Sequence, residues 1–253
     1  MKYYQSDLLL KSKHGFFADK YNTKDNGIYL LPQRKNKISQ TLNQVDYIPD
    51  RSKIAEKLEL KSEMLIHLNQ IHSSKIIKVE TLSNFMPFDA DGMITNIPEV
   101  GLCILTADCA PILLSDSKAG IVGAIHAGWR GALAGITVST IQSMVDMGAE
   151  RDQINACIGP CISQKNYEVG SDLKSMFTDN CKENENFFLK KGNEKFLFDL
   201  PNYLVDSLRK EKIQNIDLIN ACTYEEEKYF HSYRRSFHKN KKCQLRNTSV
   251  IKL

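Results

Sequence analysis

Three residues of types that bind metals or act as nucleophiles stand in polar breaks at the ends of apolar segments. They are His72 in "NQIHSS", Cys109 in "TADCAP" and His126 near the end of "GIVGAIHAG". Short apolar runs bounded by Gly, Pro and Asp are typical of fully buried strands. Because strand ends meet at the edge of a sheet, we expect the two imidazoles and the thiol to converge there.

Two imidazoles and one thiolate form a three-ligand set with a free fourth position, which is the usual arrangement of a catalytic zinc ion. The same set with a weak axial ligand suits copper. A third interpretation uses no metal and pairs the Cys109 thiolate, as a nucleophile, with a histidine base. The three residues are far apart in the chain, so their spacing leaves all three interpretations open.

A glycine-rich turn follows His126. In "HAGWRGALAG" the chain passes from a strand into a predicted helix, with glycines at 128 and 131. Glycines permit tight turning and close approach to the backbone, and a helix start directs free N–H groups at the loop. Arg130 adds a fork of donors suited to phosphate or carboxylate. We therefore predict an anion site at Gly128, Arg130 and Gly131, beside the imidazole.

The elements that must position these residues mix strands and helices. Strands are predicted within residues 27–31, 63–80, 100–116, 120–128, 154–162, 195–200 and 216–224, and helices within 51–60, 132–148, about 170–179 and from Pro201 onward. Gly148 is expected to end the second of these helices. The chain shows no internal repeat and no long linker. We predict a single domain over residues 1–253, of the α+β class with mixed sheets.

The composition is that of an ordinary soluble globular protein. The 253 residues are 42% hydrophobic and 25% charged, which is enough to bury a core without disulfide bonds. No secretory signal and no run of the roughly 18 apolar residues that a membrane span needs is visible, so no membrane partner is expected. The seven cysteines are an odd number without paired spacing. We expect reduced thiols and a cytoplasmic location.

The end of the chain is basic. From Lys228 onward there are eight Lys or Arg residues and no Asp or Glu. We interpret this segment as a solvated basic face on the last strands, and the alternative is an anion-binding face for nucleic acid. Its aromatic residues are expected to pack a terminal strand rather than stack on bases, so nucleic acid is not an expected partner. They are Tyr229, Phe230, Tyr233 and Phe237.

Several motifs together resemble one known family. In order, the chain carries "NQIHS", "DADGMIT", "TADCAP", "HAGWRG", "GPCISQKNYEVG", "FDLPN", "ACT" and "HSYRR", over about residues 65–253. This pattern resembles the laccase-domain family of YfiH-like proteins, once called multicopper polyphenol oxidases. The combination of H-A-G-W-R-G with A-D-C-x-P is highly specific. The resemblance implies a layered α/β/β/α sandwich.

The resemblance also implies an activity and a cofactor. The family's zinc ligands fall on His72, Cys109 and His126. The implied reaction is phosphorolysis of purine nucleosides such as adenosine, inosine and guanosine, with methylthioadenosine cleavage and adenosine deamination alongside. Purine nucleosides and phosphate are then the partners. One alternative is a Cys–His hydrolase that edits peptidoglycan precursors, and another is a copper polyphenol oxidase, which ranks lower because only three clear ligands are present.

Further residues receive roles from the resemblance. Arg51 matches a basic residue that the family places near the phosphate. Arg234 and Arg235 are expected to line the same site, with a solvent-facing role for one of them as the alternative. Asp108 is expected to hold or accept a proton, or to orient a ligand or turn.

The chain departs from the family pattern in its N-terminal third. "FFADKYNTKDNGIY" stands where the family usually has Arg-Gly-Gly-x-Ser, and Ser73 replaces the glycine that follows the first metal histidine. We therefore expect the nucleoside specificity to differ while the metal ligands are kept.

Overall fold

The computed structural model describes residues 2–18, 51–80, 88–241, 243 and 245–253. The strand predicted at 27–31 and most of the divergent N-terminal segment lie outside these residues. The α-helices of the described part are α1 (Arg51–Lys57), α2 (Trp129–Leu133), α3 (Ile136–Asp146), α4 (Ser171–Asn180), α5 (Leu200–Lys210) and α6 (Tyr233–His238). Its strands are β1 (Lys2–Tyr4), β2 (Lys13–Ala18), β3 (Leu65–His67), β4 (Ile76–Lys78), β5 (Gly92–Thr95), β6 (Gly101–Thr106), β7 (Ala110–Asp116), β8 (Ile121–Ala127), β9 (Asn155–Ile158), β10 (Glu168–Gly170), β11 (Phe188–Gly192), β12 (Lys195–Phe198), β13 (Asn215–Leu218) and β14 (Asn247–Lys252).

Two mixed sheets form the centre of the molecule. One has the order β1-β2-β14-β6-β3 and the other the order β13-β9-β7-β8-β5-β4. Each contains both parallel and antiparallel neighbours; β3 runs parallel to β6, for example, whereas β14 runs antiparallel to it. The strands read as continuous apolar runs in the sequence because both faces of the central strands are buried.

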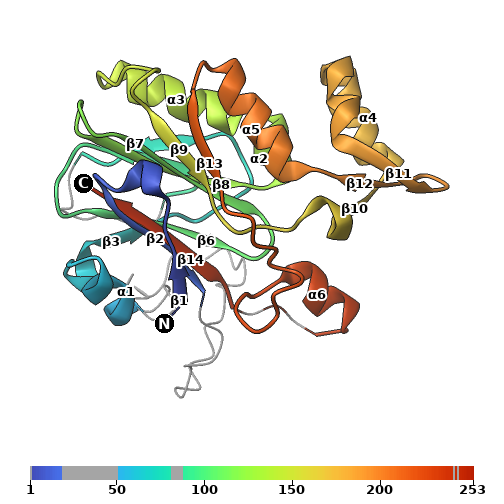
Figure 1. Ribbon diagram of the computed structural model, residues 1–253, viewed down its shortest axis with the longest axis horizontal. Helices are drawn as coiled ribbons and strands as arrows, with labels where there is room; N and C mark the ends of the chain where they lie inside the picture. Colours follow the sequence, from blue (N-terminus) through green and yellow to red (C-terminus); the bar gives the residue numbers. More distant parts are fainter. Residues whose placement is uncertain (1, 19–50, 81–87, 242, 244) are drawn as a thin grey trace, which may run out of the picture.

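The alternation of side chains along the strands builds three separate cores. On β8, Val122 and Ala124 face the other sheet, whereas Ile121 and Ile125 face the helices. On β6, Leu102 and Ile104 likewise enter the core between the sheets, and the intervening residues pack under α1. Helices α3 and α5 cover the outer face of the six-stranded sheet, and α1 lies on the opposite side of the molecule (Figure 1). The predicted α+β sandwich with layers α/β/β/α is therefore confirmed.

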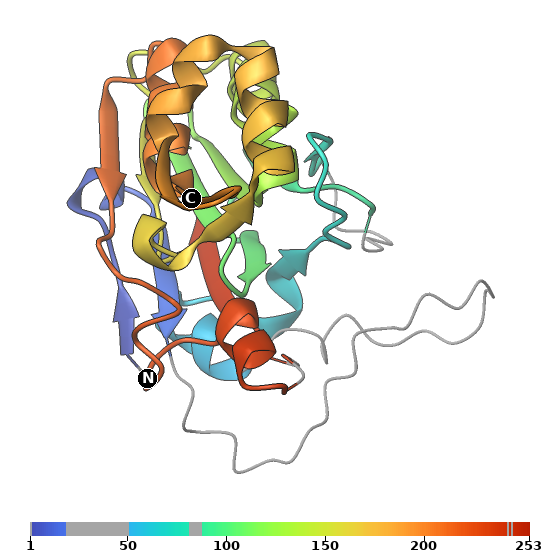
Figure 2. The ribbon, with the colours of Figure 1, turned by 90° about the vertical axis from the view of Figure 1, so that its right-hand side faces the viewer.

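A small third sheet extends this sandwich at one end. Its strands have the order β10-β12-β11, and α4 packs beside it (Figures 1 and 2). Phe177 of α4 contacts Phe188 and Phe198 of this sheet with ring centroids 5.7 and 4.8 Å apart. The aromatic cluster joins the small sheet to the core beneath α5.

The helix predicted over residues 132–148 starts earlier and is interrupted. The chain turns into α2 at Trp129 and leaves it at Gly135, whose φ of 79° lies in the left-handed region that glycine adopts without cost. Helix α3 then runs to Asp146, and Gly148, with a φ of 108°, follows its end as predicted. The interruption was not predicted because Ala132 and Gly135 lie within one continuous apolar pattern.

The basic end differs from its prediction in part. Phe230 is buried and stacks on Tyr4, with ring centroids 5.8 Å apart, as expected of a packed residue. Tyr233 and Phe237 instead lie on the short helix α6 with 61% and 67% of their surfaces exposed. The expectation that both pack a terminal strand is wrong, because that strand, β14, begins only at Asn247.

Two further expectations concern the state of the cysteines and the presence of a membrane span. All seven cysteines are free thiols. Among the described helices, none combines the length and the apolar character that crossing a membrane requires.

His67 makes the stability of this fold depend on pH. The side chain is buried in β3, and burial together with the charge of Arg51 lowers its pKa to about 4. In the unfolded chain, His67 takes up a proton near pH 6.5. Between pH 6.5 and pH 4 the unfolded state therefore binds more protons than the folded state, and the free energy of unfolding falls as the pH falls. From pH 7 to pH 5 we expect His67 alone to remove about 2 kcal/mol of the free energy of unfolding.

Denaturant unfolding at both pH values measures this loss. The variant His67→Gln is expected to lose less stability on acidification than the wild type. Equal pH dependence in the wild type and His67→Gln would contradict the assignment.

Candidate metal centre

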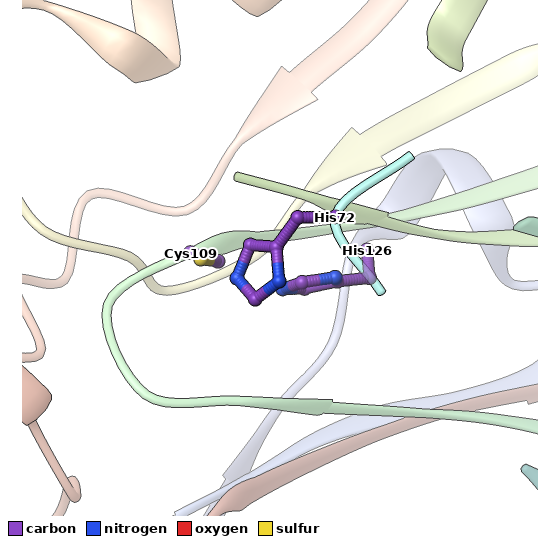
Figure 3. A group of neighbouring side chains, drawn as sticks. All are labelled: His72, Cys109 and His126. Atoms are coloured by element: carbon purple, nitrogen blue, oxygen red, sulfur yellow. The ribbon is translucent and has the colours of Figure 1, made fainter. Parts of the chain in front are cut away.

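Loops at one edge of the six-stranded sheet bring His72, Cys109 and His126 together. His72 lies between β3 and β4, Cys109 in the link from β6 to β7, and His126 on β8 beside the start of β7. One ligand atom from each residue lies within 4.8 Å of the others. The side chains point toward a common centre (Figure 3). His72 is exposed, Cys109 half-buried and His126 buried, so the group opens to solvent on the His72 side.

Asp91 sets the orientation of His126. The ring nitrogen Nδ1 of His126 lies 2.8 Å from Asp91 Oδ1, and the carboxylate is fully buried. A buried carboxylate accepts, so Nδ1 carries the proton and Nε2 keeps its lone pair for a metal ion. This carboxylate–histidine arrangement is the usual support of a metal-ligating histidine.

The same carboxylate holds the loop that carries the other histidine. The backbone N–H of His72 donates to Asp91 Oδ1 at 2.9 Å, and the N–H of Ser73 donates to Oδ2 at 2.6 Å. His72 has a φ of 61°, an unusual value for a residue with a side chain. Asp91 thus fixes one histidine through its ring and the other through its backbone.

Ser73, which departs from the family pattern, also contributes to this support. Its hydroxyl group donates to Asp91 Oδ2 at 2.8 Å. A glycine at this position would supply the backbone bond only. Ser73 therefore helps to fix the histidine loop to Asp91 through two hydrogen bonds. The effect of this residue on nucleoside specificity stays a prediction.

The charges of the group favour a thiolate. Burial by itself would raise the pKa of the Cys109 thiol, but His126 and His72 outweigh it and lower the value to about 6. Burial would likewise lower the pKa of His126, but Cys109 and Asp91 raise it to about 9. In the metal-free protein Cys109 and His126 consequently form a thiolate–imidazolium pair near neutral pH, and the thiolate is the form that binds metal.

Gly128 leaves room between two of the ligands. A Cβ atom there would lie 3.0 Å from Cys109 Sγ and 3.0 Å from His72 Cδ2. The donor set, the orientation imposed by Asp91 and this open space together fit a metal ion held by two nitrogens and one sulfur. Within the described residues, this is the one His/Cys/Asp/Glu group that meets these distances.

Gly131 packs α2 onto the histidine loop. A Cβ atom on Gly131 would lie 2.9 Å from the backbone oxygen of Ser73. These contacts give Gly128 and Gly131 packing roles, and α2 has only five residues, so the dipole of a long helix is not available for an anion. The exposed guanidinium of Arg130 lies over the Trp129 ring, 4.3 Å from its centroid. The phosphate role of these residues stays a prediction.

Asp108, the residue before the thiol, joins the centre to the C-terminal segment. Its side chain accepts hydrogen bonds from Thr223 Oγ1 at 2.7 Å, Ser232 Oγ at 2.9 Å and the backbone N–H of Arg234 at 2.7 Å. Its φ of 88° is unusual for a residue with a side chain. Three donors on one buried carboxylate favour an orienting role over the proton-accepting role predicted from the sequence.

The two arginines of the "HSYRR" motif have side chains in different surroundings. The Arg234 guanidinium lies 5.6 Å from the centroid of the half-buried Tyr167 ring. Arg235 is buried, and its guanidinium donates to the carbonyls of Thr223 at 2.6 Å, Tyr224 at 2.7 Å and Phe230. Arg235 therefore holds its own segment together, whereas the Arg234 guanidinium lies against Tyr167.

Arg51 begins helix α1, and the phosphate role that the resemblance suggests for it stays a prediction. It is buried at the start of α1 and donates to the Leu65 carbonyl at 2.6 Å. Burial lowers the pKa of His67 and the charge of Arg51 lowers it further, whereas burial raises the pKa of the Cys103 thiol and Arg51 opposes that rise. These contacts belong to the core under α1, and they are not contacts with His72, Cys109 or His126.

Two residues of this centre were not predicted. Asp91 belongs to the carboxylate-rich "DADGMIT" turn, and Tyr167 to "NYEVG", but neither received a role. The signal for Asp91 was present as a carboxylate directly before a buried strand. What was missing is the pairing of β5 with β8, in which Gly92 lies opposite Ile125 and so places Asp91 beside His126.

Comparisons with known proteins identify relatives of this chain. Residues 43–252 match the family model described as multi-copper polyphenol oxidoreductase laccase. A Rickettsia prowazekii protein named purine nucleoside phosphorylase is 33% identical over 179 residues, 70% of this chain and 73% of the relative. A Rickettsia conorii protein that also bears the name purine nucleoside phosphorylase is 30% identical over 203 residues, 80% and 82% of the two chains. The Bacillus licheniformis hypothetical protein YfiH aligns with a TM-score of 0.79 at 25% identity over 96% of this chain and 93% of its own. The chain belongs to the multi-copper polyphenol oxidoreductase laccase family.

Proposed function

We propose that this protein is a zinc-dependent purine nucleoside phosphorylase that acts on adenosine, inosine and guanosine, and on methylthioadenosine, with adenosine deamination as an accompanying activity. The observation that carries the proposal is the His72–Cys109–His126 group with one open side. The names of the Rickettsia relatives, at 33% and 30% identity, supply the reaction class. The seven free thiols suit the cytoplasmic location that we propose.

Phosphorolysis transfers the ribosyl group from the base to phosphate. A phosphate oxygen forms a bond to the anomeric carbon of the ribose, the bond from that carbon to the purine nitrogen breaks, and the base leaves with the electron pair and takes up a proton. The products are ribose 1-phosphate and the free base. The chain must therefore bind an anion next to the sugar and stabilise negative charge on the departing base.

The residues around the centre divide these tasks. We assign anion binding to the guanidinium groups of Arg130 and Arg234. Arg130 lies on α2, which follows the His126 strand, and the backbone N–H of Arg234 donates to Asp108, the residue before Cys109. When bound, zinc supplies a Lewis acid and lowers the pKa of a water molecule, which is the chemistry that deamination requires. Asp91 holds Nδ1 of His126 and so directs Nε2 toward the metal position, and Gly128 leaves the ligands room to approach one another.

Asp108 has an orienting role in this proposal. The variant Asp108→Ala leaves Thr223, Ser232 and the Arg234 N–H without their acceptor, so we expect a loss of about 3 kcal/mol in the free energy of unfolding. The KM for phosphate is expected to rise because Arg234 loses its anchor. Denaturant unfolding and steady-state kinetics below the unfolding transition measure the two effects.

Asp116 offers a matched control at the opposite end of β7. Like Asp108, it has a buried carboxylate that accepts three hydrogen bonds. Here all three come from backbone N–H groups, those of Lys118, Ala119 and Glu150. Asp116→Ala is expected to destabilise the protein to a similar extent without changing the KM for phosphate. If both variants raise this KM equally, the orienting role of Asp108 is refuted.

The experiment that tests the proposed function measures release of free base from inosine and adenosine, with and without phosphate, together with metal content. About one zinc ion per chain is expected. Base release that requires phosphate and yields ribose 1-phosphate supports the phosphorylase, and ammonia released from adenosine supports the deaminase. A zinc-containing protein that releases no base would refute the substrate while leaving the metal site in place.

The thiolate–imidazolium pair of Cys109 and His126 favours a second candidate, a Cys–His hydrolase acting on peptidoglycan precursors. In that enzyme Cys109 would attack the substrate and His126 would act as the base. Activity that survives chelation of the metal but is lost on alkylation of Cys109 would support it. A copper polyphenol oxidase ranks lower, because the described residues provide one group of three ligands rather than a cluster of metal sites.

A further inference from the structure

Tyr167 is held rigidly beside the metal centre by the small third sheet. Its backbone N–H donates to the Gln164 carbonyl at 3.1 Å, and its own carbonyl accepts from the N–H of Phe198 at 3.0 Å. The ring packs against the Phe198 ring with centroids 5.7 Å apart. The backbone and the ring of Tyr167 are thus fixed on both sides, which directs the hydroxyl group to a defined place.

The Tyr167 hydroxyl feels the charges of the centre. The hydroxyl interacts electrostatically with Cys109, Arg234, Asp108 and Arg130, and the Arg234 guanidinium lies 5.6 Å from the ring centroid. Burial raises the pKa of the Tyr167 hydroxyl, and the charge of Cys109 raises it further, while Arg234 opposes this change. The phenol is consequently neutral at physiological pH and available as a hydrogen-bond donor.

The hydroxyl has no protein acceptor within the described residues. The hydrogen bonds recorded for Tyr167 there involve its backbone only. The side chain is half-buried, so its oxygen is not sealed in the core. A neutral donor that is fixed in position, lies near the Arg234 guanidinium, feels the charge of Arg130 and has no protein partner among the described residues is suited to an anionic ligand.

We propose that Tyr167 is a phosphate-binding residue, whose hydroxyl group donates a hydrogen bond to the phosphate that Arg130 and Arg234 attract. This assignment rests on the proposed function and adds a residue to its site. A hydroxyl group binds a phosphate oxygen without adding charge, so it adds a fixed donor to those that the two guanidinium groups supply. The ribose hydroxyls are the other acceptors near such a site, and they do not need two flanking cations.

Tyr203 provides a matched control. Its ring also contacts Phe198, with centroids 6.1 Å apart, and packs edge-on against Phe177 and Phe187. The charges that act on its hydroxyl come from Lys210, Asp206 and Cys181, not from the metal centre. Tyr167→Phe and Tyr203→Phe therefore remove the same atom from the same aromatic cluster, one facing the centre and one facing away.

Three measurements on the full-length, metal-loaded protein test the proposal. These are the KM for phosphate, the KM for inosine, and the Kd of inorganic phosphate from calorimetric titration without nucleoside. For Tyr167→Phe we expect the KM and Kd for phosphate to rise about tenfold, the effect of losing a hydrogen bond to a charged group. The KM for inosine is expected to stay within about twofold, and metal content to be unchanged. Tyr203→Phe is expected to match the wild type in all three.

The outcomes separate this proposal from the proposed function. If the wild type binds phosphate but releases no base, the phosphorylase assignment fails, while the titration still decides the role of Tyr167. A rise in the KM for inosine with an unchanged KM for phosphate would overturn the proposal and assign the hydroxyl to the nucleoside. Equal phosphate affinity in the wild type and Tyr167→Phe, or no phosphate binding by the wild type, would also overturn it.

Discussion

The variant Cys109→Ala is expected to bind metal far more weakly than the wild type and to lose base release from inosine. Cys109 supplies the only sulfur of the three donors, and its thiolate carries the negative charge that balances the cation. Loss of a supporting partner of a ligand costs roughly 10- to 100-fold in metal affinity, and loss of the ligand itself should cost more than that. Metal analysis after gel filtration, and base release in the presence of phosphate, measure the two effects.

Cys181→Ala is the matched control for this experiment. Cys181 is another half-buried thiol, but its Sγ donates to Glu183 at the end of α4, away from the centre. This variant should retain both metal and activity. If Cys109→Ala keeps its metal and loses only activity, the thiol is a nucleophile rather than a ligand, and the Cys–His hydrolase becomes the better description.

The variant Asp91→Asn is expected to lower metal affinity by about 10- to 100-fold while all three ligands remain. The carboxylate accepts from His126 Nδ1, from the backbone N–H groups of His72 and Ser73, and from the Ser73 hydroxyl. An amide has one acceptor oxygen, so at least one histidine loses its support. Metal affinity is measured by competition with a chelator of known strength.

The neighbouring carboxylate of the same motif provides the control. Asp89 is exposed and bonds Asn69, so Asp89→Asn should leave the affinity within about twofold of the wild type. Denaturant unfolding of both variants, in the metal-free state, then separates stability from metal binding. If Asp91→Asn is destabilised but binds metal as tightly as the wild type, the carboxylate supports the fold alone and our account of the centre is wrong.

The sequence was sufficient to predict that the three ligands lie near one another, because each stands where an apolar run of residues is interrupted or ends. His72, Cys109 and His126 all interrupt or end apolar runs, and such runs become strands whose ends share an edge. The layered sandwich came from family motifs rather than from periodicity. The alternation that separates its three cores cannot be read from runs in which both faces of the strand are apolar.

The unpredicted features depend on pairings between distant segments. Asp91 reaches His126 only through the register of β5 with β8, which local sequence does not contain. Arg234 and Arg235 are adjacent and chemically identical, so the sequence does not tell them apart. Only the position of three backbone carbonyls, those of Thr223, Tyr224 and Phe230, determines that the guanidinium of the second arginine donates to them. The left-handed turn at Gly135 divides a pattern that is apolar on both sides.

The position of β14 has a consequence for how the protein forms. Residues 247–252 lie between β2 and β6, so strands separated by more than a hundred residues must meet before this sheet is complete. Pairings of such long range close large loops and make folding slow. The hydrogen bond from Ser232 to Asp108 likewise joins segments separated by more than a hundred residues. We therefore expect the support that the C-terminal segment gives to Asp108, beside the ligand Cys109, to form late in folding.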